Sequence, residues 1–153
     1  MAKEIERKFL VTSDAYKNCP RKYYKQGYLS TDPDKTVRVR VAGDRGFITI
    51  KGRNSGVTRA EYEYEISVGD ANEMLDNLVK TGLIEKWRYV CEHDGKTWEV
   101  DEFLGDNAGL VVAEIELGSE GEAFAKPEWV GDEVSGDARY YNSSLSQHPY
   151  KDW

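Results

Sequence analysis

Glu4-Ile5-Glu6-Arg7-Lys8-Phe9, close to the start of the chain, is the stretch that decides the predicted fold. Side chains on a β-strand alternate between two faces, so Glu4, Glu6 and Lys8 share one face and the intervening residues share the other. Carboxylate oxygens bind hard divalent cations, and an ammonium group donates hydrogen bonds to phosphate. The stretch therefore predicts a strand whose charged face suits a metal-complexed polyphosphate.

The same alternation recurs in short runs rich in Val, Ile, Tyr and Thr, separated by Gly, Asn and Asp. Residues 43–46 and 93–96 are predicted hairpin turns, because Asp and Gly tolerate the positive φ that such turns require. The candidate strands are residues 3–11, 22–29, 36–42, 46–52, 59–67, 86–92, 97–103 and 110–117. Eight largely antiparallel strands are enough to close a β-barrel, so the predicted fold class is mainly β (α+β).

One helix is predicted between Asp70 and Gly82, with Asp70 as its cap, an apolar stripe through Leu75 and Leu78, and Gly82 as its end. We expect it to pack on the outside of the sheet. Weaker helical patterns cover residues 13–19, 120–126 and 138–145, and residues 146–153 resemble a loose tail. A chain of 153 residues with no linker or repeat predicts a single domain, residues 1–153.

Composition limits the possible partners. A net charge of −7 argues against binding to nucleic acid or to an anionic membrane surface, because either would need a basic face. No apolar run approaches the roughly 18–20 residues that span a bilayer, and the N-terminus does not have the pattern of a signal peptide. We therefore expect a cytoplasmic protein with no nucleic-acid or membrane partner.

The cysteines and histidines predict no conventional metal centre. Cys19 and Cys91 form no CxxC pair, and we expect both to be reduced thiols. His93 and His148 lack the spacing of zinc ligands. A bound metal ion would therefore have oxygen ligands.

Alternation shows which residues share a face but not which face points inward. The charged faces could simply be wet, as is common in antiparallel sheets. Arg38 and Arg40 argue for a different interpretation, because arginine favours bidentate contacts with phosphate or carboxylate. The aromatic faces are also bulky enough to be buried under helices, which would leave the charged faces lining a barrel. Charges inside a barrel would need mutual compensation by bound metal and phosphate.

A series of short motifs runs in order along the chain: Glu4-x-Glu6-x-Lys8, Gln26-Gly27-Tyr28-Leu29, Arg38-x-Arg40, Thr49-Ile50-Lys51, Glu61-x-Glu63, Lys86-x-Arg88, Trp98-Glu99-Val100-Asp101 and Glu114-x-Glu116. This series resembles the CYTH superfamily, the triphosphate tunnel metalloenzymes. Residues 107–110 and 139–142 are also similar to segments of small bacterial members. The resemblance implies a closed eight-stranded antiparallel β-barrel that forms a tunnel, with triphosphate and divalent metal inside.

The resemblance also implies roles for individual residues. Four residues are expected to act in catalysis: Glu4, Glu6, Lys8 and Lys86. The expected phosphate-binding residues are Lys8, Arg38, Arg40, Lys51, Lys86 and Arg88. The expected metal ligands are Glu4, Glu6, Glu114 and Glu116, with Glu61, Glu63 and Asp101 as possible helpers. Lys25 and Glu65 are left open, because a one-residue slip in strand register would turn each to the opposite face.

The leading functional hypothesis is metal-dependent hydrolysis of inorganic triphosphate to diphosphate and phosphate, with Mg²⁺ or Mn²⁺ as the all-oxygen-ligated cofactor. An adenylate cyclase, or a nucleoside or thiamine triphosphatase, is the alternative on the same scaffold. A non-catalytic binder of polyphosphate or nucleotide is the alternative from a different class. A homodimer is possible, although barrel closure does not require one.

Overall fold

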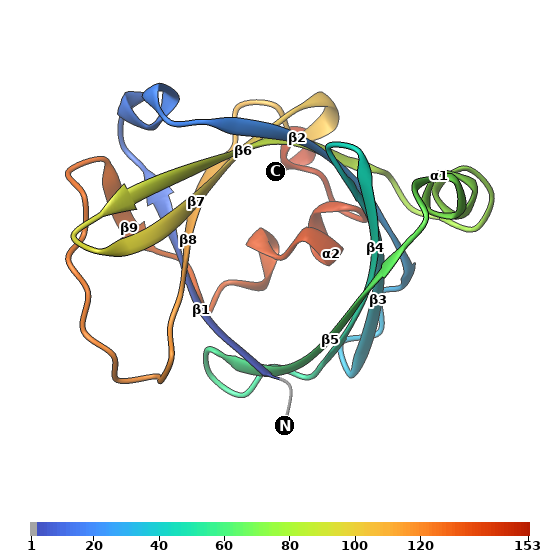
Figure 1. Ribbon diagram of the computed structural model, residues 1–153, viewed down its shortest axis with the longest axis horizontal. Helices are drawn as coiled ribbons and strands as arrows, with labels where there is room; N and C mark the ends of the chain where they lie inside the picture. Colours follow the sequence, from blue (N-terminus) through green and yellow to red (C-terminus); the bar gives the residue numbers. More distant parts are fainter. Residues whose placement is uncertain (1–2) are drawn as a thin grey trace.

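The computed structural model describes residues 3–153, which form a closed antiparallel β-barrel (Figure 1). The strands are β1 (Lys3–Val11), β2 (Arg21–Ser30), β3 (Lys35–Ala42), β4 (Arg45–Gly52), β5 (Thr58–Ile66), β6 (Ile84–His93), β7 (Lys96–Phe103), β8 (Val111–Glu116) and β9 (Val130–Glu133). The α-helices are α1 (Val68–Asn77) and α2 (Asn142–Leu145), and the 3-10 helices are η1 (Ala15–Asn18), η2 (Gly105–Asn107), η3 (Ala138–Tyr140) and η4 (Tyr150–Asp152). No helix in this described range is long and apolar enough to cross a membrane.

Eight strands close the barrel in the order β5-β4-β3-β2-β6-β7-β8-β1, and β1 pairs with β5 to complete the ring. This confirms the predicted fold class. The closing seam is short, since β1 and β5 share three residue pairs, Lys3↔Ala60, Glu4↔Arg59 and Ile5↔Thr58. The ninth strand, β9, was not predicted, and it pairs with the other end of β1 at Phe9 and Val11.

The turn predicted at residues 93–96 forms there, whereas the turn predicted at residues 43–46 lies one residue earlier, at 42–45. Ala42 pairs with Arg45 and His93 pairs with Lys96, so each hairpin has a two-residue turn. Asp94 and Gly95 have φ angles of 50° and 74°, the left-handed conformation that type I′ hairpin turns require. These turns fix the register that places alternate residues on the inner face.

The outer face is covered differently on its two sides. Helix α1 packs Ala71 and Leu75 onto Val39 of β3. The opposite side, made by β1, β6, β7 and β8, is covered by η1, β9 and the segment 117–130, which contribute Tyr16, Phe124 and Val130 to a core around Trp98. Figure 1 shows α1 and β9 on opposite sides of the ring.

Three predictions about helices need correction. Helix α1 begins after Ser67, whose Oγ accepts a hydrogen bond from the amide of Asp70, and it ends at Asn77 rather than at Gly82. Residues 120–126 form no helix and instead belong to the covering segment, where Phe124 packs against Trp98. Residues 138–145 split into η3 and α2, because Tyr141 between them is extended, with ψ of 135°.

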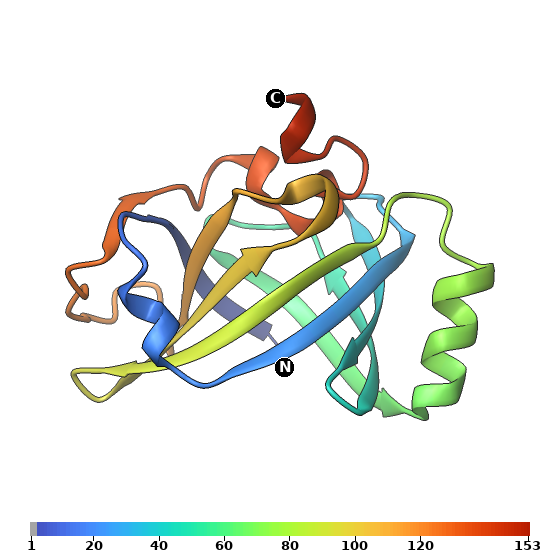
Figure 2. The same ribbon diagram turned by 90° about the horizontal axis from the view of Figure 1, so that it is seen from above.

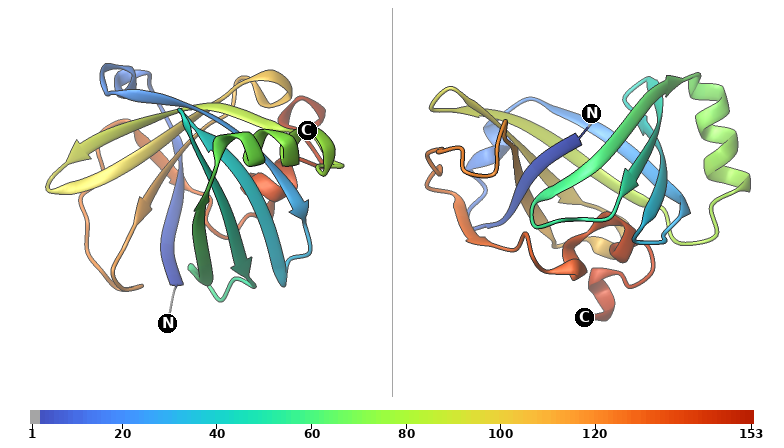
Figure 3. Two further views of the ribbon diagram at one scale, coloured as in Figure 1. Left: turned by 45° about the vertical axis from the view of Figure 1, so that its right-hand side comes forward. Right: turned by 90° about the horizontal axis from the view of Figure 1, so that it is seen from below.

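The C-terminal segment is not a loose tail, and α2 does not pack outside. Figures 1 and 2 show residues 138–153 across one end of the barrel, with α2 inside the outline of the ring. Trp153 packs edge to face against Tyr140 at 5.1 Å between ring centroids, and the amide of Tyr150 donates to Asn107 Oδ1 at 2.8 Å. Both views in Figure 3 place this segment at the same end.

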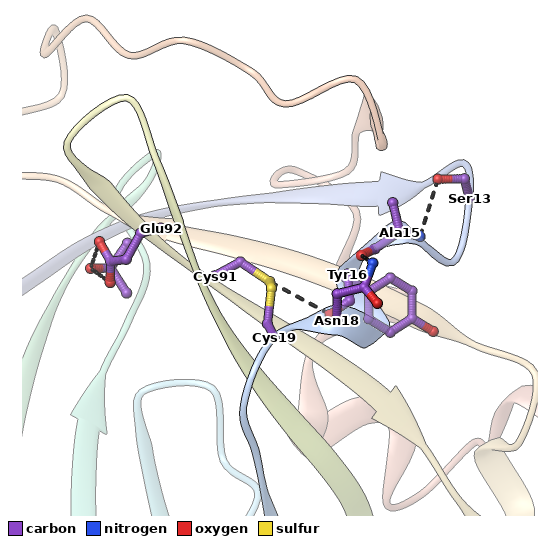
Figure 4. Close-up of a disulfide and its surroundings, with 8 residues drawn as sticks. Ser13, Ala15, Tyr16, Asn18, Cys19, Cys91 and Glu92 are labelled. Carbon is purple, nitrogen blue, oxygen red and sulfur yellow. Dashed lines mark hydrogen bonds between the residues drawn. A yellow bond between two sulfur atoms is a disulfide. The ribbon is translucent and has the colours of Figure 1, made fainter.

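The prediction of two free thiols is wrong, because Cys19 and Cys91 form a disulfide with a Cα–Cα distance of 5.4 Å (Figure 4). The two residues are 72 positions apart in sequence. They meet because Arg21 of β2 pairs with Tyr89 of β6, and continuing this antiparallel register by two residues places Cys19 opposite Cys91. The bond ties the η1 connection to β6.

Candidate active site

The barrel encloses a cavity of about 300 Å³ whose lining is mainly charged. Its charged lining residues are Glu4, Glu6, Lys8, Arg38, Arg40, Lys51, Arg59, Glu61, Glu63, Arg88, Glu99, Glu114 and Glu116. Among the described residues 3–153, Val57 contributes the single aliphatic side chain of the lining. The charged faces of the strands therefore point into the barrel.

One end of the barrel interior is closed by apolar side chains. Leu10, Ile84, Phe103 and Val112 continue the inner-face pattern of β1, β6, β7 and β8 beyond the charged residues, and they form a cluster with Tyr140 and Leu145. We call this cluster, which also includes Leu110, the floor. Ser146 of the C-terminal segment is held beside it, since its carbonyl accepts a hydrogen bond from the amide of Gly82. The floor fills this end of the barrel interior, and its side chains are not part of the cavity lining.

The pairing of β1 with β8 assembles the carboxylates. Glu6 lies directly opposite Glu116, and Lys8 lies opposite Glu114. Lys8 Nζ is 3.5 Å from Glu114 Oε1 and 3.8 Å from Glu6 Oε1. Glu4 is one step further along the same face of β1. The four residues predicted as principal metal ligands therefore line the same cavity.

These carboxylates differ in ionisation. Burial, together with the charge of Glu114, raises the pKa of Glu6 to about 8. Burial also opposes ionisation of Glu114, but the combined charges of Lys8, Arg88 and Lys86 lower its pKa to about 2. For Glu116, burial and Glu4 raise the pKa. The group thus contains crowded carboxyls whose negative charge is not fully compensated by the protein.

This donor set fits a hard divalent cation in its chemistry, since all its ligands are carboxylate oxygens. A cation would also relieve the repulsion from Glu114, which adds to burial in raising the pKa of Glu6. Within residues 3–153, however, no three Asp, Glu, His or Cys side chains are already gathered closely enough to hold a metal ion. The reason is visible at Glu4, whose Oε1 is 2.6 Å from Lys51 Nζ. Some carboxylates are held by neighbouring cations, and those pairs must separate before a metal can bind.

The basic side chains of the cavity come mainly from strands other than β1 and β8. Arg38 and Arg40 of β3 and Lys51 of β4 line the cavity. Arg38 Nη2 is 3.6 Å from Glu63 Oε1, and its Nε is buried without a hydrogen-bond partner. A buried donor without a partner costs free energy, so the Nε–H of Arg38 is suited to donate a hydrogen bond to a bound anion. Burial and the charge of Arg38 lower the pKa of Arg40 to about 9.

Lys86 and Asp101 lie behind the cavity wall rather than on it. Lys86 Nζ donates to Asp101 Oδ2 at 2.6 Å, and Arg88 donates to both oxygens of Asp101 at 2.8 and 2.9 Å. The exposed fractions of Lys86 and Asp101 are 0% and 1%. Burial would raise the pKa of Asp101, but Arg88 and Lys86 hold it far below its ordinary value. Burial lowers the pKa of Lys86 to about 7, although Asp101 opposes that shift.

The remaining predicted residues fall into two groups. Glu61 and Glu63 line the cavity, and Glu61 Oε2 is 3.4 Å from Lys51 Nζ. Lys25 and Glu65, which were left open, are not part of the lining. Lys25 pairs across the strands with Glu85, and the exposed Glu65 accepts two hydrogen bonds from Arg45.

Several lining residues were not predicted. Arg59 shares a face of β5 with Glu61 and Glu63, so the period-two pattern extended by one step would have found it. Tyr24 also lines the cavity, and its ring lies 4.8 Å from the guanidinium carbon of Arg40. Ser135, Tyr141, Asn142 and Ser143 also line the cavity, and they come from C-terminal segments that carry no strand periodicity. Only the folded chain brings those segments to the barrel.

Comparisons with known proteins agree with this geometry. The CYTH domain family model matches residues 2–148. An inorganic triphosphatase of Acetivibrio thermocellus is 56% identical over 154 residues, which cover 100% of this chain and 99% of that protein. An inorganic triphosphatase of Nitrosomonas europaea is 39% identical over 147 residues, covering 94% and 96%. The crystal structure of an inorganic triphosphatase has a TM-score of 0.69 at 35% identity and covers 95% of each chain. The protein therefore belongs to the CYTH domain family.

Proposed function

We propose that this protein is a metal-dependent triphosphatase that cleaves inorganic triphosphate to diphosphate and phosphate inside the barrel. The observation that carries the proposal is the enclosed cavity of about 300 Å³, where basic side chains and carboxylates converge. Two relatives that align with nearly the whole chain are named inorganic triphosphatases. The small aliphatic surface of the lining also favours a substrate without an organic group.

The basic residues would hold the phosphates. In the described structure Lys51 contacts Glu4 and Glu61, Arg38 contacts Glu63, and Lys8 contacts Glu114. Phosphate oxygens can replace these carboxylates as partners, because a charge-assisted hydrogen bond to phosphate is at least as favourable. Triphosphate binding would then free the carboxylates, which couples anion binding to the appearance of a metal site.

Glu4, Glu6, Glu114 and Glu116 would hold the cation, with Glu61 and Glu63 next to them, and Mg²⁺ or Mn²⁺ suits oxygen ligands. When bound, such a cation neutralises phosphate charge and lowers the pKa of a coordinated water. Lys8, Arg38, Arg40 and Arg88 would stabilise the charge on the transferring phosphoryl group. Asp101 and Lys86 would orient Arg88 from behind the wall. Arg88 donates a hydrogen bond to each carboxylate oxygen of Asp101, and Lys86 donates to one of them.

The activity is tested by measuring phosphate and diphosphate release from inorganic triphosphate, ATP and thiamine triphosphate, each with Mg²⁺, Mn²⁺ or a chelator. Metal-dependent cleavage of inorganic triphosphate at the highest kcat/KM is expected. Cyclic AMP formed from ATP would instead assign a cyclase. Tight triphosphate binding with no turnover would assign a non-catalytic receptor.

The metal role of Glu4 is tested by Glu4→Gln. Losing one ligand charge is expected to lower kcat about 100-fold or more, comparable to losing a key transition-state contact, while the fold is kept. Glu65→Gln is the matched control, because Glu65 lies on the β5 run but outside the lining. An unchanged kcat and metal dependence in Glu4→Gln would remove Glu4 from the metal site.

The phosphate role of Arg38 is tested by Arg38→Ala. Loss of a charged hydrogen bond is worth about 1.5–3 kcal/mol, so the KM for triphosphate is expected to rise roughly 10- to 100-fold. Arg45→Ala is the control, since Arg45 is exposed and bonds to Glu65. Equal KM values in wild type and Arg38→Ala would argue against a phosphate contact at this position.

A further inference from the structure

Two neutral amides, Gln26 and Asn142, connect buried cations of the site. Gln26 lies opposite Arg40 in the β2–β3 pairing, and its Oε1 accepts a hydrogen bond from Arg40 Nε at 2.7 Å. Its Nε2 donates to Asn142 Oδ1 at 3.1 Å, and the same oxygen accepts from Lys86 Nζ at 3.2 Å. The chain Arg40–Gln26–Asn142–Lys86 therefore links β3, β2, the C-terminal segment and β6.

We propose that Gln26 and Asn142 are positioning residues that fix Arg40 for triphosphate binding and make the C-terminal segment part of the binding site. This inference rests on the proposed function. Neither amide needs to contact the reacting atoms, since both act through the cations to which they are bonded.

The chemistry of an amide explains why Gln26 suits this position. Gln26 has an exposed fraction of 0% and must accept from Arg40 on one side and donate to Asn142 on the other. A carboxylate could accept from Arg40 but could not donate, and an apolar side chain would leave Arg40 Nε unsatisfied. An amide does both without adding charge.

Neutrality matters for Arg40. Within residues 3–153, Arg40 and Arg59 are the lining cations that have no carboxylate within 4.0 Å, whereas Lys8, Arg38, Lys51 and Arg88 each have at least one. Arg40 is only 9% exposed, and an uncompensated charge at that depth is costly. Holding Arg40 through a neutral acceptor keeps its full positive charge available for an anion.

Asn142 extends this arrangement to the C-terminal segment. It is the first residue of α2, and Leu145 of the same helix is buried in the floor with Ile84 and Phe103. The position of the Asn142 amide is therefore set by packing of the floor. If Arg40 is fixed through Gln26 and Asn142, then triphosphate bound at Arg40 favours the docked C-terminal segment, and the two equilibria are linked.

The experiment compares wild type, Gln26→Met, Asn142→Ala and the double variant. The steady-state KM and kcat for triphosphate are measured, along with triphosphate affinity by calorimetry in chelator and hydrogen exchange of residues 140–146. Each single variant is expected to raise KM about tenfold with kcat changed less than threefold, and the double variant is expected to resemble the singles, because one chain of bonds is broken in each. Triphosphate is expected to slow exchange in wild type but not in Gln26→Met.

The controls separate positioning from simple destabilisation. Ser144→Ala lies on the same short helix, and its hydroxyl makes no hydrogen bond in the described residues, so its KM should equal that of wild type. Asn142→Asp keeps an acceptor oxygen for both Gln26 and Lys86 and should restore the triphosphate-dependent protection that Asn142→Ala loses. Melting temperatures measured without ligand identify variants that are only less stable.

Wild-type KM and wild-type exchange protection in both single variants would overturn the inference, as would strictly additive effects in the double variant. Failure of the proposed function gives a different result. If wild type bound triphosphate without cleaving it, the hydrolase assignment would fall, whereas loss of affinity and of protection in Gln26→Met would still support the positioning role.

Discussion

The two sides of the barrel differ in how far their outer faces are buried, although their strands carry the same alternating pattern. We call β6, β7, β8 and β1 the covered wall, because η1, β9 and the segment 117–130 bury its outer face around Trp98 and Val100. We call β3, β4 and β5 the open wall. Its outer face is only partly covered by α1, and Ile50, Tyr62 and Tyr64 remain 39%, 43% and 59% exposed.

The inner faces differ in the same way. Asp101 on the covered wall is 1% exposed and bonds to Lys86 and Arg88, whereas the Glu63 side chain on the open wall is 42% exposed and lies 3.6 Å from Arg38. Burial from both sides fixes the Lys86–Asp101–Arg88 network of the covered wall, because a buried pair resists separation. The comparison indicates that the Asp101 network of the covered wall is a preorganised frame, whereas the more exposed pairs of the open wall can rearrange around a substrate.

The largest expected effect comes from breaking the buried ion network with Asp101→Asn. The substitution leaves Lys86 and Arg88 without their common carboxylate in a buried site, and such losses cost about 3–5 kcal/mol of unfolding free energy. Urea denaturation measures the change. Glu63→Gln is the open-wall control and should cost less than about 1 kcal/mol, as exposed pairs do. Equal losses from the two substitutions would abolish the distinction between the walls.

The second effect is removal of the disulfide that ties η1 to the covered wall. Cys19→Ser should lower the unfolding free energy by about 2–4 kcal/mol, because the bond closes a long loop in the unfolded chain. Thiol reductant should lower the melting temperature of wild type to that of the double variant Cys19→Ser/Cys91→Ala. The melting temperature of the double variant should not change when the reductant is added. A wild-type melting temperature insensitive to full reduction would show that packing alone holds η1.

The third and smallest effect concerns the pH dependence of Glu6 at the metal-free site. Burial and Glu114 raise the pKa of Glu6 from 4.5 to about 8, so the folded state binds more protons than the unfolded state between these values. The contribution of Glu6 protonation to the free energy of unfolding is therefore complete below pH 4.5, and it is lost as the pH rises through about 8.

Glu6→Gln removes this titration. In chelator it should become more stable than wild type as the pH rises, by roughly 1–3 kcal/mol near pH 9, and the difference should shrink near pH 5. Stability curves at several pH values measure this. Parallel curves for the two proteins would show that Glu6 is ionised throughout, and Glu65→Gln should give such parallel curves.

The sequence by itself determined the strands, the barrel and most of the charged lining. Alternation with a period of two assigns side chains to faces, and the order of the charged pairs is the signature of the family, so Glu4, Glu6, Lys8, Arg38, Arg40 and Lys51 were all placed in the cavity before the fold was known. The same period-two pattern was expected to bury the aromatic face of β5. That expectation was wrong for Tyr62 and Tyr64, because alternation does not say what covers a face.

Only the tertiary structure decided the floor, the covering of the walls and the depth of each charge. Leu10, Phe103 and Val112 form a floor because the C-terminal segment folds back over one end of the barrel, and no local pattern encodes that contact. Cys19 meets Cys91 through the β2–β6 register, and Lys86 lies behind the lining because Asp101 and Asn142 hold it there. Such features depend on which distant segments meet, whereas local periodicity records only the faces of single strands.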